Sequence, residues 1–496
     1  MVATKFKLKE KVEAFLQGTK GLYINGEYVP SKSGKTFDVI NPATEEVIAQ
    51  VSEAQKEDID AAVAAARNAF DKGEWTKLEA AERAHLIYKF ADLLEENREE
   101  LAQLEALDNG KPYQVALEDD VDGTVEHFRY YAGWATKIFG KTTQISPDYV
   151  TYTLHEPVGV VGQIIPWNFP LAMAAWKLGS ALAVGCTIVI KPASETPLSL
   201  LYVAELFKEA GFPDGVVNIV PGAGRVAGDA IITHEDVDKV AFTGSTATGI
   251  EVAKKAADQI KGITLELGGK SPAIILEDAD LDEAIEGAFN GTMYNHGQNC
   301  SACTRVFVQR PIYDKVVDEL VKRVNAVKLG PGLDPETDMG PLVSEKQQQT
   351  VLGFIEKGKE EGARLVAGGG KGLDKGYFVE PTIFADVEDD MTIAREEIFG
   401  PVMSVFPFDT IEEVIERAND SEYGLAASVW TENIKKGHYI TGKLKAGTVW
   451  INDFGLEWET MPFGGYKKSG VGREMGGEYG LANYTEVKSV FVNIKQ

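Results

Sequence analysis

The feature that most constrains the fold is a regular alternation of short apolar runs with segments of helical length, which begins near Pro157. The runs are VGVVGQIIPW, CTIVIKPA, VVNIVPG, DKVAFTGS and ITLELGG. A strand that is apolar along its whole length is typical of a parallel sheet covered by helices on both faces. The pattern therefore predicts a doubly wound α/β domain, a class that binds nucleotides at the carboxyl edge of its sheet.

Other segments add to this organisation. A second alternation runs from SPAIILEDADL to about Gly480 and predicts a second α/β domain. Near the N-terminus, LYINGEYVP predicts a hairpin with an Asn-Gly turn, and residues 58–109 predict amphipathic helices that end at Asn109-Gly110. The closing ANYTEVKSVFVNIKQ alternates apolar with polar residues in part and predicts a terminal strand. Its candidate partner is TTQISPDYVTYTLHEP.

Composition limits the kind of protein. The 496 residues suffice for two or three domains, and 76 acidic against 50 basic residues give a formal charge of −26, which disfavours nucleic acid and anionic membranes as partners. No run reaches the roughly 18 apolar residues of a membrane span. The N-terminal segment lacks the apolar core of a signal peptide, and Glu10 and Glu13 argue against a transit peptide. We expect a cytoplasmic protein.

The stretch NHGQNCSACTR contains two of the three cysteines, Cys300 and Cys303, and allows three interpretations. A zinc site needs about four ligands, whereas Cys186 is far away and the six histidines form no HxxxH pair, so we expect no metal. A redox pair would stand at the start of a helix, but here a helix-like segment precedes it. The remaining interpretation is one nucleophile with a bystander, although buried cysteines are often simple core residues.

Four further stretches accompany this cysteine in order: PWNFP, FTGSTATG, LELGGKSP and EEIFGPV. Together they resemble the NAD(P)-dependent aldehyde dehydrogenase family of the hydrolytic, cysteine-nucleophile type. The likeness extends from INGEYV and NPAT to PFGGYKKSGVGRE and YTEVK. It implies that the chain oxidises aldehydes to carboxylic acids with NAD or NADP and water, through a thiohemiacetal and a thioester.

The resemblance implies four catalytic residues. Cys300 follows Gly-Gln-x and matches the nucleophile, and the Asn168 amide with the backbone N–H of Cys300 would hold the oxyanion. Glu266 matches the general base, and Glu474 matches a second carboxylate that relays the proton. The structural alternatives are a turn residue for Asn168 and a surface glutamate at a strand end for Glu266. His296 could share a helix face with Cys300, but we favour a structural role for it.

The resemblance also implies contacts to the cofactor. Lys191 and Glu397 would bind ribose, Phe399 and Trp167 would lie near the nicotinamide, and the turn at 244–245 would lie under the pyrophosphate. The expected cofactor-binding residues are Ile164, Trp167, Lys191, Ser194, Gly224, Gly244, Ser245, Glu397 and Phe399. The stretch GSTATG lacks the central glycine of G-x-G-x-x-G.

Ser194 departs from the family pattern, because NAD-preferring members usually have glutamate after Lys-Pro-Ala. A glutamate there would repel a 2′-phosphate, whereas Ser194 can donate to it and Lys191 can pair with it. We therefore expect NADP to be accepted. Glu195 is close enough in sequence to support NAD binding.

The expected substrate pocket comprises Phe169, Met173, Trp176, Glu457 and Phe463. Its apolar members suit aliphatic or aromatic aldehydes, unless they are plain core residues. Glu457 and Glu459 in the loop NDFGLEWETMPFGG, with Trp458 between them, leave an amino- or betaine-type aldehyde as the alternative. A charged loop tip can also be a simple solvated loop.

The domain organisation follows from the same resemblance. We expect an NAD(P)-binding domain at 1–138 and 158–268, a catalytic domain at 269–480, and a small β oligomerisation element at 139–157 and 481–496. The expected partners are a small aldehyde and further copies of the chain, in a tetramer. Two rivals remain: a CoA-acylating dehydrogenase, against which Glu266 argues, and a non-enzymatic relative, against which both Cys300 and Glu266 argue.

Overall fold

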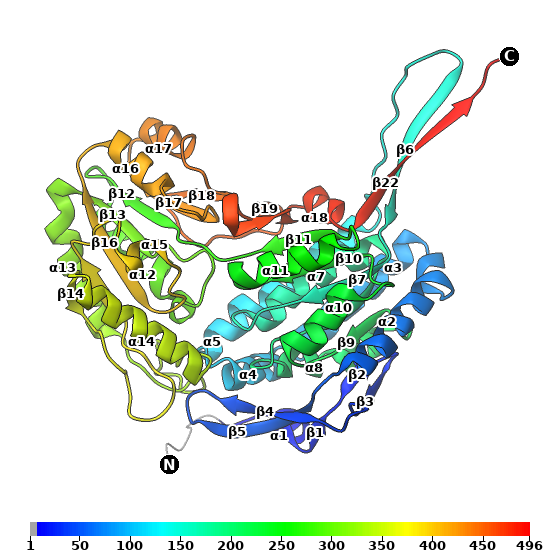
Figure 1. The fold of residues 1–496 in the computed structure, drawn as a ribbon, viewed down its shortest axis with the longest axis horizontal. Coiled ribbons are helices and arrows are strands. Elements are labelled where there is room, and N and C mark those ends of the chain that lie inside the picture. The colour runs from blue at the N-terminus through cyan, green and yellow to red at the C-terminus, as the bar shows by residue number, and fades with distance from the viewer. Residues whose placement is uncertain (1–6) are drawn as a thin grey trace.

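The computed structural model describes residues 7–496 and shows two α/β lobes side by side, with a two-stranded arm that projects from one of them (Figure 1). The sheet of the first lobe has the strand order β20-β11-β10-β7-β8-β9-β2-β3. Its strands are β2 (Leu22–Ile24), β3 (Glu27–Val29), β7 (Val160–Ile164), β8 (Thr187–Lys191), β9 (Val217–Ile219), β10 (Lys239–Thr243), β11 (Gly262–Glu266) and β20 (Gly470–Val471). The five apolar runs of the sequence are the parallel strands β7 to β11, so the predicted doubly wound fold is confirmed.

Alternate residues of these strands enter two hydrophobic cores, one on each face of the sheet. Val161 and Ile188 belong to one core, and Val160 and Val189 belong to the other. Helices of the first core are α3 (Ala80–Glu96), α4 (Arg98–Asp108), α6 (Gly123–Trp134), α7 (Pro170–Val184), α8 (Leu198–Tyr202) and α9 (Ala204–Ala210). Helices of the second core are α2 (Lys56–Asp71), α10 (Asp229–Thr233) and α11 (Thr246–Ala257). Because both faces are covered, β7, β8 and β10 are buried throughout.

The strand order places a crevice at the carboxyl edge of the first sheet. The chain starts in the middle with β7, adds β8 and β9 on one side, and then crosses to add β10 and β11 on the other. The connections after β7 and β10 therefore leave in opposite directions, which opens a binding crevice at this switch point. The loops that follow β7, β8 and β10 carry residues 165–169, 192–197 and 244–245 to that edge.

The second lobe is built on a seven-stranded sheet in the order β14-β15-β16-β13-β12-β17-β18, parallel except for β14. Its strands are β12 (Pro272–Ile275), β13 (Arg305–Gln309), β14 (Arg364–Ala367), β15 (Thr382–Ala385), β16 (Val402–Phe408), β17 (Ala426–Trp430) and β18 (Thr448–Ile451). Helices α12 (Leu281–Met293) and α13 (Tyr313–Ala326) share one core with this sheet. Helices α14 (Glu345–Glu360), α16 (Ile411–Asn419) and α17 (Ile434–Thr441) share the other. The predicted second α/β unit is present, and its chain returns to the first lobe through β20.

Two further β-structures agree with the sequence patterns. The hairpin β2–β3 turns at Asn25 and Gly26, which both have the left-handed φ that an Asn-Gly turn provides. Strands β1 (Thr19–Lys20), β4 (Thr36–Asn41) and β5 (Glu46–Ser52) form a small sheet beside it, and helix α1 (Glu10–Leu16) precedes them. The arm consists of β6 (Tyr149–Pro157) and the terminal strand β22 (Thr485–Asn493), antiparallel over their full length. No helix within residues 7–496 is long and apolar enough to cross a membrane.

Candidate functional site

The chain turns sharply between α12 and Cys300. Asn295, His296 and Gly297 have φ of 48°, 59° and 68°, so three consecutive residues are left-handed and end the helix. His296 therefore does not share a helix face with Cys300, and the Cys-His arrangement does not form. Its Nε2 accepts the N–H of Gly340 at 3.0 Å, and burial lowers the pKa of the imidazole to about 3. His296 holds the turn in a neutral, structural role.

The two neighbouring cysteines lie in different surroundings. Cys300 is partly exposed and lines a cavity of about 580 Å³, whereas Cys303 is fully buried in the apolar core around α12. Burial raises the pKa of Cys303 to about 12. Burial also raises the pKa of Cys300 well above its usual value, and the carboxylates of Glu457, Glu397 and Glu266 raise it further. Both cysteines are free thiols.

Asn168 lies in the loop between β7 and α7, where it contacts the loop that carries the cysteine. The side-chain Nδ2 of Asn168 donates to the backbone carbonyl of Gln298 at 3.0 Å, and the backbone carbonyl of Asn168 accepts from Asn295 Nδ2 at 2.9 Å. The side chain is almost fully buried. An amide donor is thus held beside the loop of Cys300.

Glu266 is the last residue of β11 and lies at the carboxyl edge of the first sheet. The two glycines that follow allow close approach of other groups. A Cβ on Gly268 would lie 2.1 Å from Glu397 Oε2, and one on Gly269 would lie 2.5 Å from the carbonyl oxygen of Cys300. Both carboxylate oxygens of Glu266 are buried without a hydrogen-bond partner among residues 7–496. Burial raises the pKa of Glu266 well above that of an ordinary glutamate.

A buried ion pair acts on Glu266. Glu474, in β21 (Glu474–Met475), accepts a hydrogen bond from Lys177 of α7, whose Nζ also donates to Thr243 Oγ1 at 2.6 Å. The charge of Glu474 raises the pKa of Glu266 further, and Lys177 opposes it. Sequence reasoning identified Glu474 and missed Lys177. The available signal was a single lysine in the otherwise uncharged helix PLAMAAWKLGSALAV.

The loop after β8 brings two of the expected cofactor-binding residues together. Lys191 Nζ and Ser194 Oγ both donate to the carbonyl of Gly222, at 3.0 Å and 3.4 Å. Burial lowers the pKa of Lys191 to about 8. Gly224 lies two residues further on, at the start of the π-helix Gly224–Gly228. A Cβ on Gly224 would meet no atom within 4 Å, so this side of the crevice is open.

The loop after β10 presents the start of α11. Ser245 caps this helix, because its Oγ accepts the N–H of Thr248 at 3.3 Å, and Gly244 precedes it. Ile164 ends the neighbouring strand β7. The N-terminus of a helix at the carboxyl edge of a parallel sheet is suited to bind a phosphate group.

The second lobe completes the crevice with a carboxylate and an aromatic pair. Glu397 Oε1 accepts the N–H of Gly269 at 3.0 Å, and burial raises the pKa of Glu397 to about 7. Trp167 and Phe399 pack edge to face at 5.2 Å, and Phe399 has the left-handed φ of 56°. A helix N-terminus for phosphates, a carboxylate for ribose hydroxyls and an aromatic pair for a flat ring together fit a nicotinamide dinucleotide. Residues 7–496 contain no cluster of three His, Cys, Asp or Glu side chains arranged to hold a metal ion.

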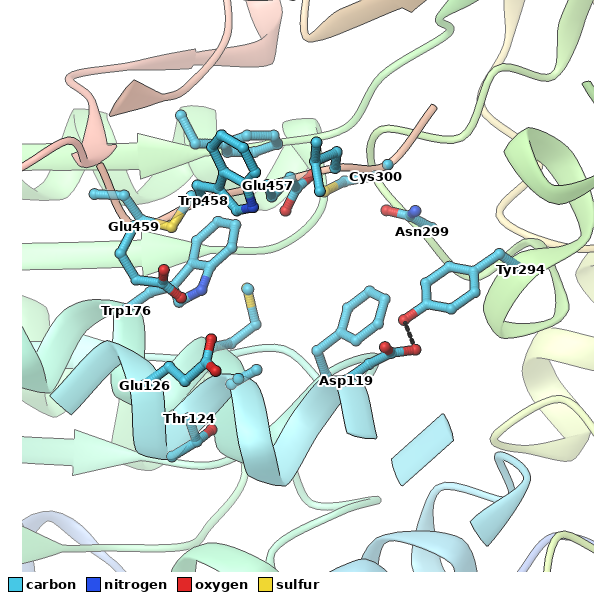
Figure 2. A pocket seen from close by; sticks show the side chains of 18 of the residues that line it. Asp119, Thr124, Glu126, Trp176, Tyr294, Asn299, Cys300, Glu457, Trp458 and Glu459 are labelled. Carbon is cyan, nitrogen blue, oxygen red and sulfur yellow. Dashed lines mark hydrogen bonds between the residues drawn. The ribbon is translucent and has the colours of Figure 1, made fainter. Parts of the chain in front are cut away.

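Figure 2 shows the cavity that reaches Cys300 and the two kinds of side chain that line it. The aromatic residues are Phe169, Trp176, Tyr294, Phe454, Trp458 and Phe463. The acidic residues are Glu118, Asp119, Glu126, Glu457 and Glu459. Met173 also lines the cavity, so the five residues expected in the pocket are brought together. Lysine, arginine and histidine are absent from the described lining residues.

Three of these carboxylates were not anticipated from the sequence. Glu118 and Asp119 come from the π-helix Ala116–Asp122, and Glu126 comes from α6, which follows it directly. They lie more than 170 residues before Cys300 in the chain. A π-helix shifts the side-chain positions relative to an α-helix, and its sequence gave no sign of this shift.

Comparisons with known proteins agree on one family. The model described as the aldehyde dehydrogenase family matches residues 28–490. The mitochondrial aldehyde dehydrogenase of Homo sapiens is 55% identical over 478 residues, which cover 96% of this chain and 92% of that protein. An NAD+ complex of an aldehyde dehydrogenase from Bacillus cereus is 69% identical with a TM-score of 0.98, covering 99% of this chain and 100% of that one. A betaine aldehyde dehydrogenase from Staphylococcus aureus, in complex with NAD+, is 43% identical with a TM-score of 0.95, and the match covers 98% of this chain and 97% of that one.

Proposed function

This chain belongs to the aldehyde dehydrogenase family, and on that premise we propose that Cys300 is the nucleophile through which it oxidises aldehydes to carboxylic acids. The enzyme uses a nicotinamide dinucleotide as its electron acceptor. The observation that carries the assignment is the position of Cys300, which alone of the three cysteines lines the cavity. Its carbonyl also lies against Gly269, just after the strand that ends in Glu266.

The first chemical step is attack of the Cys300 thiolate on the aldehyde carbon. A C–S bond forms, and the carbonyl π electrons move onto oxygen to give a thiohemiacetal oxyanion. We assign the Asn168 amide and the backbone N–H of Cys300 as the donors to this oxygen. The Asn168 amide has a neutral carbonyl as its acceptor in the free protein, so the more negative oxyanion is a better partner. Loss of one such donor typically lowers the rate ~10²–10³-fold.

The second half of the reaction releases the acid. When bound, the oxidised nicotinamide accepts the hydride that leaves the thiohemiacetal carbon. A thioester on Cys300 remains, and Glu266 takes a proton from the water that attacks it, after which the Cys300 thiolate leaves. Its raised pKa makes Glu266 a stronger base than an exposed glutamate, and its unpartnered oxygens are available to a water. Glu474, paired with Lys177, is the group to which we assign the onward proton relay.

The test is an assay of NAD(P)H formation and of acid release without CoA. Cys300→Ala should abolish both, and the neighbouring Cys303→Ala is the matched control that should keep them. Glu266→Gln should still form one equivalent of NAD(P)H and then stall as the thioester. Turnover that required CoA and gave acyl-CoA in place of the free acid would establish the acylating rival, and a parent protein without NAD(P)H formation would establish the non-enzymatic one.

We infer that NADP is accepted as well as NAD. The support is that the Ser194 hydroxyl and the Lys191 ammonium donate to the same carbonyl and therefore lie close together. A 2′-phosphate near them would meet two hydrogen-bond donors, and residue 194 would bring no carboxylate to repel it. Matched assays with both cofactors check this. An NADP efficiency below about a hundredth of the NAD efficiency, a gap of roughly 2.7 kcal/mol, would overturn it.

For the substrate we propose aliphatic or aromatic aldehydes, because Phe169, Met173, Trp176 and Phe463 line the cavity beside Cys300. An apolar wall gains affinity with the apolar area that a substrate buries. Efficiency should therefore rise along a series of straight-chain aldehydes until the cavity is filled. A flat profile along that series would contradict the assignment.

The carboxylates favour a second substrate class, amino- or betaine-type aldehydes. Five carboxyl groups and no basic side chain line the cavity within the described residues, and Trp458 offers a ring face to a cation. Burial raises the pKa of Glu457 to about 8, and a bound cation would restore its charge. Glu457→Gln should lower the preference for aminoaldehydes over alkyl aldehydes of equal length. Unchanged selectivity would exclude this class.

We also propose that the enzyme is a cytoplasmic homotetramer in which the arm of β6 and β22 carries the contacts. The domain division at 1–138 with 158–268, 269–480, and 139–157 with 481–496 belongs to the same proposal. Its support is that, among residues 7–496, β22 pairs with β6 alone, which leaves an edge strand of nine residues available to another copy.

A further inference from the structure

A buried lysine lies behind the loop that carries Asn168. Lys111 is fully buried, and its Nζ donates to Asp120 Oδ2 at 2.6 Å and to the carbonyl oxygen of Asn168 at 3.0 Å. The same ammonium lies over the ring of Phe169, 4.4 Å from its centroid. Two hydrogen bonds and the face of one aromatic ring thus surround the ammonium. Lys111 therefore binds two consecutive residues, one assigned to the oxyanion and one that lines the cavity.

Side-chain donors converge on the carbonyl of Asn168. Besides Lys111, it accepts from Asn295 Nδ2 at 2.9 Å and lies 3.5 Å from Asn109 Nδ2. A peptide group is a rigid plane, so fixing this oxygen fixes the link between Asn168 and Phe169. The direction in which the Asn168 side chain leaves the backbone is restricted with it.

Neighbouring carboxylates hold the helices. Burial raises the pKa of both of them, and the charge of Lys111 opposes this rise. Glu105 accepts the N–H of Leu171 in the first turn of α7 at 2.8 Å, and Asp108 accepts the N–H of Leu198 at the start of α8 at 3.1 Å. Both carboxylates are fully buried, as is Asp120. The scaffold around the loop thus has its own hydrogen bonds, and Lys111 adds the contact to Asn168.

The partner of Lys111 comes from the wall of the cavity. Asp120 belongs to the π-helix Ala116–Asp122, in which the preceding residue, Asp119, faces the cavity and accepts a hydrogen bond from Tyr294 at 2.8 Å. The Tyr294 ring stacks on that of Phe169 at 6.0 Å. One element therefore supports both the aromatic wall and the lysine behind it.

We propose that Lys111, oriented by Asp120, is a positioning residue that holds the Asn168 amide at the oxyanion and the Phe169 ring at the substrate. The inference rests on the proposed role of Asn168. Misplacement of a reacting geometry by about 1 Å can lower a rate on the order of 10²-fold. Lys111 touches neither the aldehyde nor the cofactor in this assignment, so its effect is transmitted through Asn168.

A double-mutant cycle tests this transmission, with the single-turnover rate of NADH formation as the readout. Lys111→Met should lower that rate about 30-fold or more in the parent, and less than about threefold in an Asn168→Ala background. Equal factors in both backgrounds, or no loss in the parent, would overturn the proposal. If Asn168→Ala itself has no effect, the oxyanion assignment fails and this inference fails with it.

A second comparison separates positioning from stability. Lys111→Met alone leaves Asp120 buried without its partner, whereas Lys111→Met with Asp120→Asn removes both charges. The double variant should recover thermal stability and NAD+ affinity but not the rate. Recovery of the rate together with stability would show that Lys111 has only a structural role. Lys239→Met is the control variant. Lys239 is another buried lysine, at the start of β10 and so at the edge of the sheet away from the site, and its replacement should change the rate less than about threefold.

Discussion

Three carboxylates act on the Cys300 thiol in the same direction. Glu457, Glu397 and Glu266 each raise its pKa, in addition to the effect of burial. The thiol is therefore protonated at neutral pH in the free protein, although thiolate is the reactive form. How readily the nucleophile ionises depends on the charge state of groups up to 157 residues away in the chain.

Glu457→Gln should make Cys300 more reactive. Removing one negative charge lowers the pKa of the thiol, so more thiolate is present at a given pH. We expect iodoacetamide to alkylate the variant a few-fold faster at pH 9, where Glu457 of the parent is ionised because its pKa is about 8, with the pH profile displaced to lower pH. Glu459→Gln, two residues along the same loop, is the matched control and should have the smaller effect. A profile unchanged by Glu457→Gln would contradict the assignment.

Glu397→Gln should change how stability depends on pH. Burial raises the pKa of Glu397 from 4.5 to about 7, so the folded state favours the neutral carboxyl. The folded state keeps its full stability below pH 4.5, where Glu397 is neutral in both the folded and the unfolded chain, and it loses stability as the pH rises through about 7. A pKa shift of this size corresponds to a loss of about 3 kcal/mol in the free energy of unfolding. In the absence of cofactor, the melting temperature of the variant minus that of the parent should increase as the pH rises from 5 to 7.5. The exposed neighbour Glu396→Gln should show no such gain.

Helix ends show where the chain accepts a conformation that its residue type disfavours. Helix α11 ends in a Schellman arrangement, in which the N–H groups of Ile260 and Lys261 donate to the carbonyls of Ala257 and Ala256. The left-handed position in this motif is normally glycine, yet Ile260 occupies it with a φ of 56° and its side chain is 93% exposed. A branched side chain there is strained without any packing to compensate.

Ile260→Gly should therefore stabilise the protein by about 1 kcal/mol, because glycine adopts this φ without the steric cost. Ile250→Gly is the matched control in the same helix, where the backbone is right-handed and glycine should destabilise by about 1 kcal/mol. Chemical denaturation measures the free energy of unfolding of both variants, which should rise for Ile260→Gly and fall for Ile250→Gly. Destabilisation by Ile260→Gly would show that its side chain has a contact within the assembly.

Sequence patterns predicted the elements better than they predicted the way the elements join at the site. Continuous apolar runs gave β7 to β11, and the Asn-Gly pair gave the hairpin β2–β3. The partners of the buried charges were not predicted. Lys177 donates a hydrogen bond to Glu474, which is 297 residues further along the chain, and Lys111 donates one to Asp120, which lies in a π-helix. Such pairs depend on tertiary packing, which leaves no local pattern.

The whole molecule combines an acidic surface with an apolar arm. The formal charge of −26 favours solubility and repels other copies at long range. Against this, β22 lies on the arm that projects from the first lobe (Figure 1) and exposes Val487, Phe491 and Val492. Exposed apolar side chains on a free edge mark a contact surface.

Phe491→Lys should weaken assembly, because it replaces the most exposed aromatic side chain of the arm by a charge. Burial of a phenylalanine contributes about 2 kcal/mol, so the dissociation constant should rise at least about tenfold. Sedimentation over a range of protein concentrations measures it. Ile434→Lys places the same charge at an exposed apolar site on α17 and should leave assembly unchanged. Equal masses for all three proteins at low concentration would show that the arm is not the contact.

The left-handed turn before the nucleophile bears on how the enzyme fails when heated. Asn295 and His296 each hold a conformation that costs roughly 1–2 kcal/mol, compensated by bonds to Asn168 and Gly340 on other segments. When thermal motion breaks those bonds, the turn gains from relaxing while both sheets stay folded. Local opening should therefore begin here, with amide protons of residues 295–300 exchanging before those of β7. Catalytic activity is then lost to heat at a lower temperature than the fold itself.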